Sequence, residues 1–294
     1  MFSQPSLRSL ESLLLESGVT DLVCNGFDST QVLRGGRWQS APNPFSSEEE
    51  LADAARLLIG EGGRQLDQAN PFANVNLYGR VRVHALLASA VNSKTHISLR
   101  VHGERPFGLE QLAQIGTLSA DDYRNLASIV QSRESFLISG SSGSGKTTLL
   151  RAMLMLAAHE RIIAIEDVAE LNLEALSYVS MQTRTANVEG RGEINLQTLL
   201  TESLRMRPDR IVVGEIRGTE LITLLQAINT GHACGATIHA NSISEVSKRL
   251  LAIAHSAGLG EAALNALVRS SLNWLIHIDC IDAKRKVTIR KLAA

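Results

Sequence analysis

Apolar and polar residues repeat along the chain with two different periods, and the balance between them changes near residue 103. Residues 7–15 and 48–59 place apolar side chains every three or four positions, which predicts helices with one buried face. Period-two or β-branched runs, which predict strands, cover residues 21–23, 31–33, 76–87 and 96–101. Short helices and strands in this order favour a small α/β N-terminal domain over residues 1–103.

The second part of the chain alternates buried strands with helices. Glycine and proline interrupt the pattern around residues 104–108, so we expect a linker there. Helical spacing follows over residues 109–115 and 121–130, and Ser119 is suited to cap the second helix. Apolar runs that predict strands are SFLIS, RIIAIED, RIVVGE and GATIHA, and the helical patterns between them are TTLLRAMLMLAAH, LQTLLTESLRM and ELITLLQAIN. This order predicts a domain over residues 109–294 with a mostly parallel sheet and helices on both faces.

The stretch SGSSGSGKTTLL follows the first of these strands and opens a helix. It fits the pattern G-x-x-x-x-G-K-[ST] with Gly140, Gly145, Lys146 and Thr147. Glycines, Gly143 among them, allow the backbone to turn its amides toward phosphate oxygens, while the lysine reaches the β- and γ-phosphates and the threonine hydroxyl binds Mg²⁺. The residues expected to contact the nucleotide are Gly140, Ser141, Ser142, Gly143, Ser144, Gly145, Lys146, Thr147 and Thr148. A plain Gly/Ser turn would explain the glycines, but the strand and helix around them favour a P-loop that binds ATP and Mg²⁺.

A carboxylate ends the apolar strand RIVVGEIRG. In a RecA-like sheet the carboxyl end of such a strand lies beside the P-loop, because ligands bind at that edge. Gly214 stands where an aspartate is usual, and Glu215 follows it. Glu215 is therefore our candidate to polarise the attacking water and to help bind Mg²⁺, partly through water. The alternative is a glutamate exposed at a strand end.

A second acidic strand end occurs in RIIAIEDVAEL. We select Glu166 as a second carboxylate near the metal or the water. Acids also suit the first turn of a helix, so a solvated helix start remains an equal alternative for this cluster.

Histidines near a third strand end add a possible phosphate sensor. His239 in TIHAN is placed to sense the γ-phosphate, although a histidine in a strand is more often a hydrogen-bonded core residue. A metal site made of His232, Cys234 and His239 is disfavoured because no fourth ligand stands at a usual spacing.

Composition restricts the partners and the compartment. The formal net charge is −1 and aromatic residues make up 4% of the chain, so nothing favours specific nucleic-acid binding. Three scattered cysteines indicate reduced thiols. The N-terminus lacks the features of a signal peptide, and no apolar run approaches the ~18 residues that a spanning helix needs. We therefore expect a soluble, cytoplasmic protein, and these features leave docking on a membrane-embedded partner open.

The motifs together resemble those of the ATPases that drive type II and type IV secretion and pilus assembly. The matching blocks are GSSGSGKT for Walker A, AIEDVAEL for the aspartate box, RIVVGEIRG for Walker B and NTGHACGATIHAN for the histidine box. Gly-Glu in Walker B is a mark of that family. Within it the chain is most similar to the tight-adherence (Tad) pilus or CpaF branch, through TRTANVEGRGEINLQTLL and SLRMRPDRIVVGEIRG.

This resemblance implies a ring, usually a hexamer, whose subunits each carry an N-terminal domain and a RecA-like motor domain. The family uses N-terminal arginines against the nucleotide phosphates, and Arg82 and Arg100 match those positions. Arg205 and Arg207 match the arginines before Walker B, and Arg217 matches the one after it. Taken without the resemblance, Arg82 and Arg100 would be ordinary surface residues of strands.

We therefore expect an ATP-hydrolysing motor that powers pilus assembly or secretion through an inner-membrane platform protein, to which it binds peripherally. The alternatives are an ATPase of a type IV conjugation or effector secretion system, a nucleic-acid translocase and a nucleotide-gated scaffold without turnover. A GTPase is disfavoured because the guanine-reading motif N-K-x-D is absent. Arg184, Arg191 and His232 receive no role from the motifs.

Overall fold

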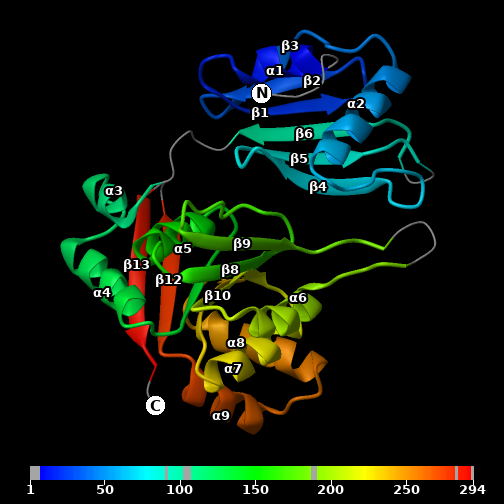
Figure 1. Cartoon of the computed structure of the whole chain (residues 1–294). Coiled ribbons are helices and arrows are strands. Elements are labelled where there is room, and N and C mark those ends of the chain that lie inside the picture. The colour runs from blue at the N-terminus through cyan, green and yellow to red at the C-terminus, as the bar shows by residue number, and fades with distance from the viewer. Residues whose placement is uncertain (1–6, 90–91, 102–106, 187–190, 282–283, 293–294) are drawn as a thin grey trace. The chain divides into compact units, whose positions relative to one another are not determined.

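The computed structural model describes residues 7–89, 92–101, 107–186, 191–281 and 284–292 (Figure 1). They form two compact units, Met1–Glu104 with Arg184–Glu193, and Arg105–Thr183 with Ile194–Ala294. The expected linker at residues 104–108 lies mostly outside the described residues. The sequence patterns had placed Arg184–Glu193 in the second domain, whereas this segment packs with the first unit.

The first unit is a six-stranded sheet in the order β3-β2-β1-β6-β5-β4, in which all neighbouring strands run antiparallel. Its elements are α1 (Arg8–Leu14), β1 (Val19–Asn25), β2 (Thr30–Arg34), β3 (Arg37–Ala41), α2 (Glu48–Glu61), β4 (Phe72–Leu77), β5 (Val81–Leu86) and β6 (His96–Val101). Val81, Val83 and Ala85 alternate with exposed residues along β5 and join the core that also contains Leu51 and Leu58 of α2. The predicted α/β character is confirmed, and one face of the sheet carries the core.

Residues 76–87 were predicted as one strand, but they form the end of β4, a tight turn and β5. Tyr78 and Gly79 both have positive φ, of 55° and 66°. The Arg80 amide donates to the Leu77 carbonyl at 3.0 Å, which closes the turn. Apolar residues on both sides continue the period of two, so the pattern alone did not reveal the reversal.

The second unit is a seven-stranded sheet in the order β13-β12-β7-β11-β10-β8-β9. The strands are β7 (Phe136–Gly140), β8 (Arg161–Glu166), β9 (Ser177–Gln182), β10 (Arg210–Ile216), β11 (Ala233–His239), β12 (Trp274–Ile281) and β13 (Lys284–Lys291). The helices are α3 (Leu109–Gln114), α4 (Ala120–Gln131), α5 (Lys146–Leu154), α6 (Leu196–Ser203), α7 (Glu220–Asn229), α8 (Glu245–Ser256) and α9 (Glu261–Ser271). Only β13 runs antiparallel to its neighbour among these strands, so the sheet is mostly parallel, as predicted.

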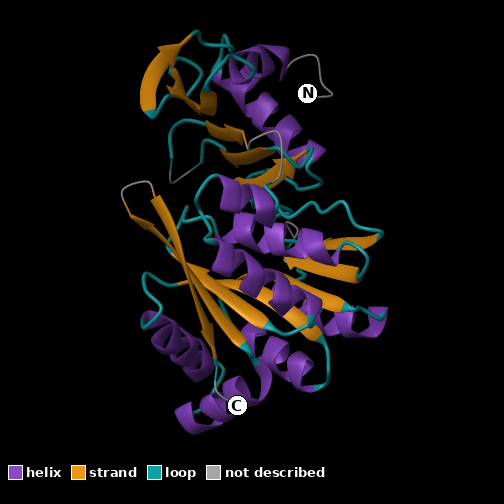
Figure 2. Ribbon diagram, turned by 90° about the vertical axis from the view of Figure 1, so that its left-hand side faces the viewer, coloured by secondary structure: helices purple, strands orange, loops and turns teal. Residues whose placement is uncertain are grey.

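Helices cover both faces of this sheet, as Figure 2 shows. Along β8, Ile162 and Ala164 join the core formed with α3, α4 and α5. Ile163 and Ile165 point the other way, into the core formed with α6, α7, α8 and α9. A strand buried on both faces must be apolar at every position, which explains the continuous run in the sequence.

Two further expectations concern helices and thiols. None of the described helices is by itself long and apolar enough to cross a membrane, although α8 and α9, bent by 118° relative to each other, pass that test as a pair on length and composition. The thiols of Cys24, Cys234 and Cys280 are free.

Candidate nucleotide site

The glycine loop connects the carboxyl end of β7 to the first turn of α5. Gly143 and Gly145 have φ of 72° and 109°, a region that L side chains rarely adopt. Gly140 was expected to serve the same purpose, but its φ is not positive. It is required for space instead, because an added Cβ would lie 2.5 Å from both the Ile278 carbonyl oxygen and the Ser144 Oγ.

Lys146 is the first residue of α5, and its side chain folds back over the loop. Its Nζ donates to the carbonyl oxygens of Gly140 at 3.0 Å and Ser141 at 2.8 Å. Burial lowers the pKa of this lysine, and the negative charge of Glu215 acts in the opposite direction. A buried cation inside a loop of backbone amides is suited to an anionic ligand with several oxygens, such as a phosphate chain.

The sheet order brings His239 between the glycine loop and the Walker B strand. Strand β11 pairs with β7 on one side and β10 on the other, and His239 stands in register with Gly140. Its Nε2 lies 3.0 Å from the Glu215 Oε1. Partial burial lowers the pKa of His239, the charge of Lys146 lowers it further, and Glu215 opposes both. Lys146, Glu215 and His239 therefore form one electrostatic cluster at the carboxyl ends of three adjacent strands.

Arg217 contacts the second oxygen of the Glu215 carboxylate. Its Nε donates to Oε2 at 2.9 Å, and its Nη1 lies 3.1 Å from the Asp167 Oδ2. An ionised carboxylate offers about four lone pairs, so Glu215 can accept a proton or a hydrogen bond from water while it keeps both protein partners. The contacts fix its orientation, as a general base requires.

The side chain of Glu166 is buried rather than open to solvent. Its Oε1 accepts hydrogen bonds from the backbone amides of Glu170 at 3.0 Å and Leu171 at 3.2 Å. Burial raises its pKa to about 7 despite these bonds. An added Cβ on Gly214 would lie 2.9 Å from the Glu166 Cγ, so the glycine of the Gly-Glu pair makes room for this side chain. The solvated helix start that the sequence allowed is wrong for Glu166.

We expect Glu166→Gln to flatten the dependence of folding stability on pH. A carboxyl whose pKa is about 7 when folded, against a reference value of 4.5, binds its proton more tightly in the native state. The wild type therefore loses stability as the pH rises from 5 to 8, by about 2 kcal/mol through this group. Urea unfolding at several pH values measures that loss. The control Glu261→Gln removes an exposed glutamate from α9 and should keep the wild-type slope, and equal slopes in all three proteins would contradict the burial argument.

The candidate arginines are carried by elements other than those of this cluster. Arg82 and Arg100 stand opposite each other on β5 and β6 of the first unit, and the Arg100 Nε donates to Asp21 Oδ1 at 2.6 Å. Arg205 precedes the amino end of β10, the end opposite to Glu215, and its Nη1 contacts the Glu202 Oε1 at 3.1 Å. Their roles toward a nucleotide stay predictions.

His232 and His239 occupy opposite ends of β11. The His232 Nδ1 lies 3.2 Å from the Ala227 carbonyl oxygen, near the C-terminus of α7, while Cys234 is buried within the strand. Among the described residues no cluster of three or more His, Cys, Asp or Glu side chains could bind a metal ion. Any Mg²⁺ would therefore depend on phosphate oxygens in addition to Thr147 and Glu215, which are hard oxygen donors of the kind it prefers.

One residue of the site was not found from the sequence. Arg285 of β13 donates through its Nε to the Ser144 carbonyl oxygen at 3.1 Å, and it lies against Gly145. The sequence of this tail, DAKRKVTIRKL, is basic, and by itself it indicates a solvated hairpin. The hairpin is confirmed by the pairing of β12 with β13, but one of its cations contacts the glycine loop.

A buried P-loop lysine, a carboxylate and a histidine on adjacent strands of a mostly parallel sheet define a P-loop nucleotide-binding protein with a RecA-like domain. The model of the family described as "Type II/IV secretion system protein" matches residues 75–290, and the chain belongs to that family. A putative conjugal transfer protein of Mycobacterium tuberculosis is 40% identical over 285 residues, which cover 94% of this chain and 81% of that protein. The type IV secretion system protein VirB11 of Bartonella quintana is 27% identical, with coverage of 96% and 90%.

Solved structures show the same fold. The ATPase DotB of Legionella pneumophila has a TM-score of 0.68 at 21% identity, covering 97% of this chain and 78% of its own. The pilus retraction motor PilT with bound ADP also has a TM-score of 0.68, at 20% identity, with coverage of 99% and 84%.

Proposed function

We propose that this chain is an ATP-hydrolysing motor of a secretion or transfer apparatus. The observation that supports it best is the convergence of Lys146, His239 and Glu215 at one edge of the sheet. A nucleotide-gated scaffold would need the lysine and the loop alone. The carboxylate held between His239 and Arg217 is the additional group that hydrolysis requires.

In the proposed reaction, water attacks the γ-phosphorus of ATP and the bond to the β–γ bridging oxygen breaks. Glu215 orients the water and accepts its proton, while Lys146 moves from its carbonyl partners to the phosphate chain and neutralises charge that develops there. His239, in contact with Glu215, is placed to report the presence of the γ-phosphate to that carboxylate. Mg²⁺ would be held by Thr147 and Glu215, partly through water, and would supply charge neutralisation at the phosphates.

Two kinds of apparatus are candidates for the system that this motor serves. The names of the similar proteins, in conjugal transfer and in type IV secretion, favour a type IV or conjugal transfer system. The Tad pilus remains the alternative supported by the motif TRTANVEGRGEINLQTLL. Neighbouring genes separate the two, because a pilin and a platform protein would accompany a pilus motor and a set of type IV secretion genes would accompany the other.

We propose further that the chain works as a homo-oligomeric ring on the cytoplasmic side of an inner-membrane platform protein. The resemblance to the family favours a hexamer. Arg82, Arg100 and Arg205 would then act on nucleotide during closure of a subunit or across a subunit boundary. Light scattering of the full chain with and without a non-hydrolysable ATP analogue measures the assembly.

Turnover tests the proposal directly. The purified full chain with ATP and Mg²⁺ should release inorganic phosphate, and added DNA should not raise the rate, because net charge and aromatic content do not favour a nucleic-acid track. Binding of ATP without phosphate release would contradict the motor and favour a nucleotide-gated scaffold. Strong stimulation by DNA would favour a translocase.

A further inference from the structure

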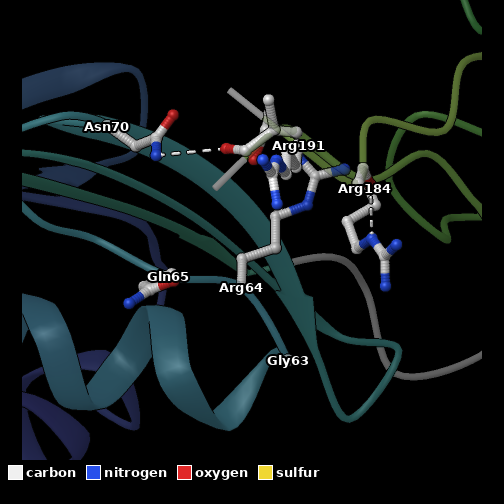
Figure 3. Close-up of a pocket in the computed structure, with 9 residues that line it drawn as sticks. Gly63, Arg64, Gln65, Asn70, Arg184 and Arg191 are labelled. Atoms are coloured by element: carbon white, nitrogen blue, oxygen red, sulfur yellow. Dashed lines mark hydrogen bonds between the residues drawn. The ribbon is translucent and has the colours of Figure 1, made fainter. Parts of the chain in front are cut away.

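A cavity of about 310 Å³ lies in the first unit, and part of its lining comes from the motif TRTANVEGRGEINLQTLL. Two chain segments line it, one that follows α2 and one within Arg184–Glu193, and Figure 3 shows the arginines of both segments around it. Its lining residues are Gly63, Arg64, Gln65, Asn70, Arg184, Thr185, Ala186, Arg191 and Gly192. The lining therefore contains three guanidinium groups and, among the described residues, no carboxylate.

Arg184 is held in place by the local backbone. Its Nε donates to the Gly192 carbonyl oxygen at 2.7 Å, across the base of the segment (Figure 3). Gly192 has a φ of 80°, and a Cβ at this position would approach the Arg184 Nη2 to 3.1 Å. This position therefore suits glycine for both its conformation and its space. This bond uses the Nε donor, and the two terminal nitrogens of the guanidinium carry four further N–H donors.

The opposite wall is also built by specific contacts. The Gly63 amide donates to the Gly60 carbonyl oxygen at 2.9 Å, and the Arg64 amide donates to the Ile59 carbonyl oxygen at 3.2 Å. These bonds to the end of α2 fix the position of the Arg64 backbone. The Asp67 Oδ1 accepts a hydrogen bond from the backbone N–H of Asn70 at 2.8 Å.

Asn70 connects the two segments. Its Nδ2 donates to the Ala186 carbonyl oxygen at 3.3 Å (Figure 3). The cavity thus has two walls that are each ordered by their own hydrogen bonds and joined by one more. Such a preorganised arrangement lowers the entropy cost of binding a ligand between them.

We propose that this cavity binds a ligand through a phosphate or diphosphate group. A guanidinium group has five N–H donors, and it can bind a phosphate through two parallel N–H···O hydrogen bonds. Arg64 and Arg191 already take part in polar interactions, and Arg184 uses its Nε. Because a guanidinium has five N–H donors, each arginine can bind a phosphate oxygen in addition to its present partner. The volume is at the lower end of the range for small-molecule sites, which suits a compact phosphorylated compound or a lipid headgroup.

A ligand in this cavity can influence the nucleotide site through the backbone that connects the two. Arg184 directly follows Thr183, whose amide donates to the Glu166 carbonyl oxygen at 3.1 Å. A ligand that restrains Arg184–Glu193 also restrains the end of β9, which pairs with the strand that carries Glu166. This consequence for turnover rests on the proposed function, whereas binding to the cavity does not.

Isothermal titration with inorganic pyrophosphate tests the site on the full chain. The P-loop is a second place for this anion, so the comparison is made in the Lys146→Ala background. That protein should keep one pyrophosphate site, and adding Arg184→Ala and Arg191→Ala should weaken it by about tenfold or more, because hydrogen bonds to charged groups are lost. Gly192→Ala, which removes no charge, should also weaken binding by displacing Arg184.

The matched control replaces Arg37 and Arg56, two exposed arginines of the same unit, by alanine and should leave pyrophosphate binding unchanged. Flotation with phosphatidylcholine vesicles, with and without phosphatidylglycerol, distinguishes a lipid headgroup from a soluble phosphate. Loss of either kind of binding in the Arg184→Ala/Arg191→Ala variant but not in the control supports the site and identifies the source. If both arginine pairs have the same effect in both assays, or neither has any, the proposal is overturned. This result does not depend on whether the chain hydrolyses ATP.

Discussion

Lys146→Ala is expected to weaken ATP binding by about 10- to 100-fold, the value of a lost charge-assisted hydrogen bond. The Lys146 Nζ lies within the loop and now bonds to the Gly140 and Ser141 carbonyls, so a phosphate chain in the loop would meet this cation first. Turnover should fall by a further factor of about 10² or more, since charge that develops on the phosphates loses its partner. Calorimetric titration with ATP and a phosphate-release assay measure the two effects separately.

Lys248 offers a matched control, because it is an exposed lysine of α8 in the same unit. Lys248→Ala should bind and hydrolyse ATP as the wild type does. An unfolding curve for Lys146→Ala shows whether the loss is local, since this side chain is buried. Wild-type turnover in a folded Lys146→Ala protein would refute the assignment of the loop as the phosphate site.

Glu215→Gln should separate binding from hydrolysis. The amide keeps the size of the side chain but cannot accept a proton from water, so ATP with Mg²⁺ should still bind while the rate of phosphate release falls by about 10²-fold or more. Contacts from His239 and Arg217 orient the Glu215 carboxylate, and in the variant both side chains lose a negatively charged partner. Single-turnover measurements with saturating ATP isolate the chemical step.

Glu110→Gln, an exposed position in the first turn of α3, is the control for a neutralised glutamate in the same unit. If Glu215→Gln hydrolyses ATP at the wild-type rate, the general base lies elsewhere, and Glu166 is the next carboxylate to test. The structure makes that outcome the less expected one, because the Glu166 Oε1 already accepts two backbone hydrogen bonds and the side chain is buried.

The parts of the fold that could be predicted are those whose pattern is local. Continuous apolar runs predicted β7, β8, β10 and β11, because a strand buried on both faces leaves no polar position. The turn at Tyr78 and Gly79 was missed, since period-two residues flank it on both sides. The packing of Arg184–Glu193 with the first unit was also missed, because contacts between distant segments leave no local periodicity.

The candidate site shows the same division. The glycine loop, Glu215 and His239 could be found because each stands in a short motif at the end of a strand. The surroundings of Glu166 could not, since its burial depends on the space left by Gly214, far along the chain. Arg285 was missed for a related reason: it contacts a residue 141 positions earlier, and its own neighbours in sequence indicate only a basic hairpin.

The contacts between this hairpin and the glycine loop have a consequence for synthesis of the protein. Ile278 and Arg285 pack against Gly140, Ser144 and Gly145, so the phosphate-binding loop gains these neighbours only after β12 and β13 have left the ribosome. Until then the nascent chain carries the loop motif without its supporting strands. Fragments that stop before the hairpin therefore lack one wall of the loop.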